Sequence, residues 1–200
     1  RTIHDFANQR IEKETEVYKF IVRWMKIFRI GIDYEVSSFG GEAHIVKIKN
    51  SDDRIVNLAD KGMGSIQLMI LLFRLASMMA NAGIQSPGQR RGDYTIIVEE
   101  PEQNLHPKLQ SKLADLFLEM YELYGFKFII ESHSEYLIRR TQILIAEKGF
   151  KSDEELKDFA PFKVIYFPGD DKEHYDMLYR TDGKFSNEFG PGFFDEAANL

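Results

Sequence analysis

Residues 93–107 read Asp-Tyr-Thr-Ile-Ile-Val-Glu-Glu-Pro-Glu-Gln-Asn-Leu-His-Pro. The apolar, β-branched run at 94–98 is bounded by turn-forming residues and predicts a buried strand of a parallel sheet. Glu99 and Glu100 follow this run, and open α/β sheets bind ligands just outside the carboxyl ends of their strands. Adjacent strand residues point to opposite faces, so one acid can hold a metal ion while the other faces a reacting water. A core strand that ends in a solvated acidic turn has the same pattern.

The apolar run followed by an acidic pair resembles a Walker B motif. In that motif the first acid holds the Mg²⁺ of the nucleotide, directly or through water, and the second acid is the general base. The resemblance therefore implies a metal-binding role for Glu99 and a catalytic role for Glu100. Glu99 stands where the motif usually has Asp, and its longer side chain implies a shifted or water-mediated contact with the metal ion.

The next seven residues, Pro-Glu-Gln-Asn-Leu-His-Pro at 101–107, resemble the D-loop of ABC-type ATPases in its RecF-like, OLD-like and SMC-like variant. This resemblance places Asn104 and His106 among the nucleotide-binding residues. Apolar residues at helical spacing predict a helix over 108–124, and a second strand follows at 126–130. A His just past that strand holds the switch position in those ATPases, which implies that His133 contacts the γ-phosphate or the attacking water.

A glycine-containing stretch, Leu-Ala-Asp-Lys-Gly-Met-Gly-Ser-Ile-Gln, precedes an apolar helix at residues 58–67. Glycines ahead of a helix let the backbone approach an anion, and the helix N-terminus adds N–H donors. The stretch resembles a divergent ABC signature motif, which reaches the γ-phosphate of ATP held by the other subunit. The candidate residues are Gly62 at the usual Ser position, Gly64, Ser65 as a replacement hydroxyl, and Gln67. A plain helix-capping turn explains the same glycines without a ligand.

Composition limits the classes of protein that fit. The 200 residues are 44% hydrophobic, which is enough for the core of one ordinary domain. A net charge of −6 argues against a protein that coats nucleic acid, although a local contact through Arg90 and Arg91 in the polar loop at 81–92 stays open. The chain has no cysteine, which favours a reducing cytoplasm. The apolar run at 66–80 is too short to span a bilayer, so a buried helix and no membrane partner are predicted.

The flanking segments predict a helix at 3–30, a β-hairpin with strands at 34–36 and 44–48 around Gly40-Gly41, and a short strand at 55–58. A helix at 135–148 and strands at 162–167 and 174–179 follow the switch His. The tail contains Asp-Gly-Lys-Phe at 182–185 and Gly-Phe-Phe-Asp at 192–195, which resembles the tail of a group of prokaryotic P-loop ATPases. We divide the chain into an N-terminal helix (1–30), an ATPase lobe (31–160) and a C-terminal hairpin and tail (161–200).

The phosphate-cradling Walker A loop, Gly-x-x-x-x-Gly-Lys-Ser/Thr, does not occur in these 200 residues. The chain begins with Arg1 and shows no signal-peptide pattern, so we expect a piece of a longer protein. The resemblance then covers the C-terminal lobe of an ABC-type P-loop ATPase of the RecF/OLD/SMC-like prokaryotic AAA group. The Walker A lobe would come from elsewhere in the protein or from another chain, and this chain alone would bind ATP poorly.

The predicted fold class is α/β: an ABC-ATPase-like P-loop lobe with a parallel sheet, flanking helices and a small β-hairpin. The resemblance implies ATP hydrolysis with Mg²⁺ between two heads of a homodimer, coupled to DNA, an effector protein or phage defence. One alternative is a nucleotide-gated dimerisation or partner-binding module that has lost turnover. A further alternative is a metal-dependent nuclease built on Glu99, Glu100, Glu102 and His106, because carboxylates and imidazoles bind Mg²⁺ or Mn²⁺.

Overall fold

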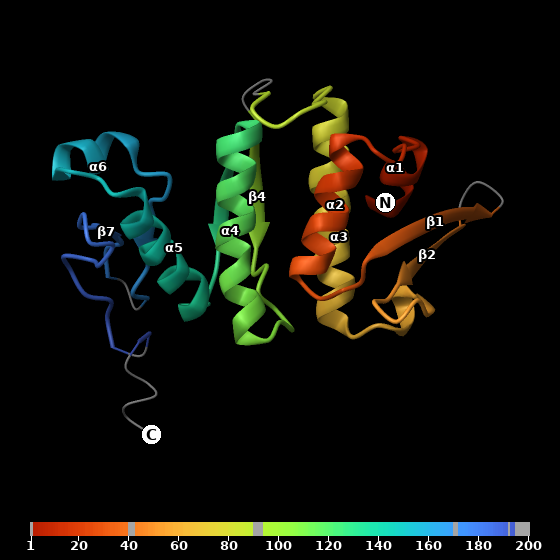
Figure 1. Cartoon of the computed structure of the whole chain (residues 1–200). Helices are drawn as coiled ribbons and strands as arrows, with labels where there is room; N and C mark the ends of the chain where they lie inside the picture. Colours follow the sequence, from red (N-terminus) through yellow and green to blue (C-terminus); the bar gives the residue numbers. More distant parts are fainter. Residues whose placement is uncertain (1, 40–42, 90–93, 170–171, 192, 195–200) are drawn as a thin grey trace.

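The computed structural model describes residues 2–39, 43–89, 94–169, 172–191 and 193–194. Figure 1 shows β4 (Tyr94–Glu99) and α4 (Pro107–Tyr124) in the middle of the chain, with the N-terminal elements on one side and the C-terminal elements on the other. The mixed α/β fold with a parallel strand pair and flanking helices confirms the predicted fold class. Some predicted features lie outside the described residues: the Gly40-Gly41 turn, Arg90, Arg91, Gly192 and Asp195.

The N-terminal helix is broken into two, and the prediction of one continuous helix at 3–30 is wrong. The structure has α1 (Thr2–Asn8) and α2 (Glu16–Ile27). Arg10 and Glu14 between them adopt φ values of 48° and 73°, which a right-handed helix cannot contain. Thr15 then begins α2 as its N-cap, since its side-chain oxygen accepts a hydrogen bond from the Tyr18 amide at 3.2 Å.

The helix α3 (Met63–Asn81) lies at the centre of the N-terminal core. By length and composition alone it could cross a membrane, with 19 residues and a mean hydropathy of 1.6. It is thus longer than the apolar run at 66–80 suggested. However, α1 and α2 pack on it, Leu72 and Phe73 are fully buried, and the Phe6 and Phe73 rings stack at 4.2 Å between centroids. Burial in this core accounts for its apolar character, as predicted.

A small antiparallel sheet confirms the predicted hairpin. It contains β1 (Asp33–Phe39), β2 (Ala43–Lys49) and β3 (Ile55–Asn57), in that order. Val36 pairs with Val46 and Tyr34 with Ile48, so the apolar side chains of both strands share the face that contacts α1 and α2. The predicted strand at 55–58 ends one residue early, because Leu58 starts the short 3₁₀ helix η1 (Leu58–Asp60). That helix leads directly to α3.

The strand β4 pairs in parallel with β5 (Phe126–Glu131), and α4 makes the connection between them. Phe128 packs against Phe117 of α4, with ring centroids 4.8 Å apart, so α4 covers one face of this sheet. Ile97 and Ile129 lie on the other face and are exposed. The prediction of a fully buried strand is therefore wrong in one respect: within the described residues, only one of its faces is covered.

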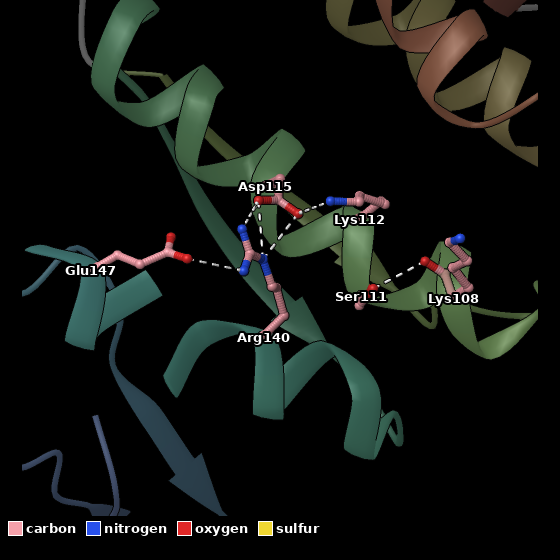
Figure 2. Close-up of polar contacts among 6 residues, drawn as sticks. All are labelled: Lys108, Ser111, Lys112, Asp115, Arg140 and Glu147. Atoms are coloured by element: carbon pink, nitrogen blue, oxygen red, sulfur yellow. Dashed lines mark hydrogen bonds and ion pairs between the residues drawn. The ribbon is translucent and has the colours of Figure 1, made fainter. Parts of the chain in front are cut away.

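The helix α5 (Glu135–Lys148) is bound to α4 by a charged contact. Figure 2 shows the guanidinium of Arg140 facing the carboxylate of Asp115, with Nη2 at 2.7 Å from Oδ1 and Nε at 3.2 Å from Oδ2. This hydrogen bond to Asp115 raises the pKa of Arg140. Glu147 of α5 adds a longer ion pair at 3.4 Å. Arg140 therefore connects two helices.

The C-terminal elements are α6 (Asp153–Phe159), β6 (Val164–Tyr166) and β7 (Tyr175–Met177). The last two form the antiparallel pair that the sequence predicts, although each strand is shorter than expected. The chain then returns toward α5, where a Cβ added to Gly183 would lie 2.0 Å from the carbonyl oxygen of Gln142. Aromatic rings of the tail pack around Tyr166, including that of Phe189 at 5.1 Å between centroids.

Candidate active site

The carboxyl ends of β4 and β5 lie side by side, because the two strands are parallel and connected by one helix. Their register pairs Glu99 with Glu131, and both residues are exposed on the face that α4 leaves open. Mg²⁺ is commonly held by one or two carboxylates together with substrate phosphates, so this pair fits the metal role predicted for Glu99. Glu131 was missed as a site residue in the sequence. The sequence feature that could have indicated Glu131 is that each of the two apolar strands ends in Glu.

Glu100 is the first residue past β4 and has an unusual backbone. Its φ is 42°, which is uncommon for a residue with a side chain and often marks a functional position. Its amide donates a hydrogen bond to the carbonyl oxygen of Glu131 at 2.9 Å, which extends the sheet by one step. Its carboxylate accepts a hydrogen bond from the side chain of Gln103. Glu100 therefore lies in a turn outside the regular strand, so the alternation of strand residues does not decide where its side chain points.

The structure brings together Glu100 and His133, the two residues that the sequence predicts as catalytic. Nε2 of His133 lies 3.5 Å from Oε1 of Glu100. His133 follows β5 in a short loop, and Ser134 then caps α5 by accepting a hydrogen bond from the Leu137 amide at 3.1 Å. The His133 side chain is 74% exposed, so it can reach a ligand without rearrangement of the core.

The start of α3 lies against the loop that follows β4. Gly62 is the N-cap of the helix, and no atom lies within 4 Å of a Cβ added there. In contrast, a Cβ added to Gly64 would lie 2.5 Å from the carbonyl oxygen of Asn104. The side-chain amide of Asn104 also donates to Oε1 of Gln67 at 3.1 Å. Glycine at position 64 therefore allows the loop after β4 to approach the start of α3. The sequence had suggested instead that this glycine allows an anion to approach. Ser65 is half-buried in the first turn of α3.

His106 has a structural explanation. It is the N-cap residue of α4, where its Nδ1 accepts a hydrogen bond from the Lys108 amide at 3.2 Å and Pro107 occupies the first turn. The side chain is exposed. The capping contact accounts for His106 without a ligand, and its contact with a nucleotide stays a prediction.

A cavity of about 620 Å³ lies between α3 and β4. Gln67 and Arg74 line it from α3, and Glu99 and Glu100 line it from the end of β4. Three of the residues predicted from sequence therefore face one space, together with Arg74, which the sequence did not indicate. An exposed arginine beside carboxylates provides the positive charge that an anionic ligand requires.

The nuclease alternative requires Glu99, Glu100, Glu102 and His106 to converge. Instead, Glu102 is buried and accepts hydrogen bonds from the loop after β5, while His106 caps α4. Across the part of the chain that the structure describes, no group of three or more His, Asp or Glu residues is placed to hold a metal ion. The arrangement thus gives no support to a metal-dependent nuclease.

Comparisons with known proteins identify the family of the chain. The family model described as an AAA ATPase domain matches residues 3–138, which is more than half of the chain. Among solved structures, the fold is similar to that of a protein studied for ATP-driven dimerisation and DNA-stimulated activation of SMC ATPases. That match has a TM-score of 0.50 and 13% sequence identity, and covers 83% of this chain and 87% of the other. A comparison with curated proteins finds no match.

The family match and the fold together define an AAA ATPase domain. The chain belongs to the AAA ATPase domain family. Its function is therefore of the ATPase type, and the predicted membership of the AAA ATPase group is confirmed.

Proposed function

We propose that this chain supplies the hydrolytic half of an ABC-type ATPase head, with Glu100 as general base and His133 as the residue that orients the γ-phosphate end. The observation that carries the proposal is the 3.5 Å approach of His133 Nε2 to Glu100 Oε1 beyond the ends of two parallel strands. A general base must lie within hydrogen-bonding reach of the proton that it accepts, and both side chains are open to a substrate there.

In this proposal, the water that attacks the γ-phosphorus transfers its proton to Glu100. The bond from phosphorus to the β–γ bridging oxygen breaks as the bond to the water oxygen forms, which yields ADP and phosphate. Mg²⁺, when bound, neutralises charge on the phosphates, and Glu99 beside Glu131 would hold it. The chain's own contribution is to position the water and the phosphate, because phosphoryl transfer depends mainly on positioning and electrostatics.

The N-terminus of α3 would complete the ATP site of a second head. The supporting observation is that Gly64, Gln67 and Asn104 lie together at the start of a long helix, and the N-terminal end of a helix favours an anion. The similar SMC protein is described by ATP-driven dimerisation and DNA-stimulated activation. By analogy, we propose a homodimer of heads in a reducing cytoplasm, with DNA or an effector protein as partner and phage defence as one setting.

A nucleotide-gated binding module is the second candidate function. Gly62 stands where the signature motif usually has Ser, and as the N-cap of α3 it offers no side-chain hydroxyl. Loss of that hydroxyl would remove one donor to the γ-phosphate and slow turnover without preventing dimerisation.

The test is Mg²⁺-dependent ATP hydrolysis by this chain together with the lobe that carries a phosphate-binding loop. Wild type is compared with Glu100→Gln and with the control Glu35→Gln, an exposed Glu on β1. We expect Glu100→Gln to abolish turnover while ATP still binds, and the control to behave as wild type. ATP binding without turnover in the wild type would favour the binding module. Failure to bind ATP would overturn both functions.

A further inference from the structure

Glu102 is a buried acid between the two loops that form the candidate site. It is only 7% exposed, although it lies in the turn after β4. Glutamate is almost never fully buried unless it is paired, because removing a carboxylate from water is costly. Within the described residues, no lysine or arginine is paired with the Glu102 carboxylate. Its position therefore needs a reason other than stability.

The carboxylate of Glu102 is anchored to the loop after β5. Its Oε1 accepts hydrogen bonds from the Ser132 hydroxyl at 2.8 Å and from the His133 backbone amide at 2.6 Å. Its Oε2 is buried and has no hydrogen-bond partner within the described part of the chain. The Ser134 amide extends this set by donating to the Ser132 hydroxyl at 3.1 Å. Because one side chain accepts from both the Ser132 hydroxyl and the His133 amide, Glu102 restrains this loop.

A second contact holds the same two loops together. The side chain of Gln110 donates to the carbonyl oxygen of Leu105 at 3.0 Å and accepts from the Ser134 hydroxyl at 2.6 Å. His133 is therefore held on both sides through its backbone, while its ring stays mostly exposed and points its Nε2 toward Glu100. Within this set, Glu102 is the member that contacts His133 itself.

We propose that Glu102 is a positioning residue that fixes the backbone of His133 and so directs its ring toward Glu100. This inference rests on the proposed function in so far as it concerns hydrolysis. Glu102 does not touch the substrate and acts through His133. The arrangement makes the turn after β4 and the loop after β5 move as one unit, so a change in one loop is transmitted to the histidine of the other.

The first test is a double-mutant cycle in the ATP-hydrolysing form of the protein, with Glu102→Ala, His133→Ala and the double variant. We expect Glu102→Ala to lower kcat by about 100-fold, because a catalytic group displaced by about 1 Å can lose that much. The affinity for ATP should change little. In the His133→Ala background, Glu102→Ala should have almost no further effect, since both changes remove the same contribution. Losses that simply multiply would overturn the proposal.

The second test does not require hydrolysis. Amide hydrogen exchange of the peptide that contains residues 131–135 is compared among wild type, Glu102→Ala and Glu102→Gln. Gln keeps one acceptor oxygen, whereas Ala keeps none, so exchange should be intermediate for Glu102→Gln and fastest for Glu102→Ala. The control is Glu119→Gln. This change removes a partly buried carboxylate of α4 that pairs with Arg23 of α2 and lies outside the two loops. It should leave this peptide unchanged.

The two tests separate the possible failures. If the wild type shows no turnover, the proposed ATP hydrolysis fails, and if His133→Ala leaves turnover intact, the proposed role of His133 fails. In either case, hydrogen exchange alone tests whether Glu102 positions His133. Faster exchange in Glu102→Ala would then support the positioning role. Unchanged exchange in a variant that keeps the wild-type Tm would overturn it.

Discussion

Gly64, in the first turn of α3, lies against the carbonyl oxygen of Asn104, so that a Cβ on Gly64 would be only 2.5 Å from that oxygen. Asn104 itself has a φ of 56° and donates its side-chain amide to Gln67, one turn further along α3. The beginning of α3 and the loop after β4 are thus fitted to each other at a distance that only glycine allows.

We predict that Gly64→Ala destabilises the protein by about 1–3 kcal/mol, the usual cost of forcing a methyl group into a packed site. Because the obstacle is backbone, it cannot move aside as a side chain would. Thermal unfolding should show a lower Tm. The matched control is Gly62→Ala, two residues earlier, where the added methyl group meets no atom within 4 Å. Equal losses of stability in the two variants would contradict this account of Gly64.

Arg140 and Asp115 provide a second prediction (Figure 2). Arg140→Ala should lower the free energy of unfolding by about 1.5–3 kcal/mol, because it removes the closer of the two cations that pair with a carboxylate only 20% exposed. The other cation, Lys112 at 3.3 Å, remains. Arg140→Lys keeps the charge but loses the two-pronged contact, so its loss should be intermediate. Chemical denaturation measures both.

The control for Arg140 is Arg54→Ala. Arg54 also pairs with an aspartate, Asp52 at 2.6 Å, but its side chain is 78% exposed. Exposed ion pairs contribute about 0–1 kcal/mol, so this variant should remain close to wild type. The expectation for Arg140 is wrong if Arg140→Ala is no more destabilising than Arg54→Ala.

A third prediction concerns pH and Asp33. Burial acts to raise the pKa of Asp33, but hydrogen bonds from Tyr18 and the Tyr34 amide, with the charge of Lys13, lower the pKa overall. The Tyr18 hydroxyl donates to Oδ1 at 2.6 Å. A carboxyl group whose pKa is lower in the folded protein adds stability above its unfolded pKa of about 3.9, and this stability is lost as the pH falls through the folded value.

Asp33→Asn should therefore destabilise the protein most at neutral pH. The difference from wild type in the free energy of unfolding should shrink as the pH drops below about 4. Tyr18→Phe, which removes one of the hydrogen bonds, should weaken the same dependence. Denaturant unfolding at several pH values checks both variants. A difference that stays constant from pH 7 to pH 3 would show that Asp33 acts without its charge.

Much of the fold was predictable because it depends on local patterns. The strands at Tyr94–Glu99 and Phe126–Glu131 and the helix between them have unambiguous periodicity, and the observed elements match within a residue or two. The break at residues 9–15 was missed, because helical spacing of apolar residues continues across it. The signal that could have indicated the break is Thr15 followed by Glu16, a helix start.

Some residues of the candidate site could likewise be assigned from sequence, and others could not. Glu99, Glu100 and His133 could be assigned from sequence, because the Walker B and switch positions that they resemble are recognised by their order along the chain. Glu131 and Glu102 were not assigned to the proposed site. The first becomes relevant through strand register, and the second through its burial and its contact with a residue 31 positions away.

The sequence by itself determined the order of the elements, the acidic pair and the histidine, since these follow from residues close together in the chain. Only the tertiary structure decided that Gly64 meets Asn104, that Glu102 holds His133, and that the described residues leave one face of β4 and β5 uncovered. The physical reason is that burial and hydrogen-bond partners between distant segments depend on how helices and strands pack, and local periodicity contains no information about that packing.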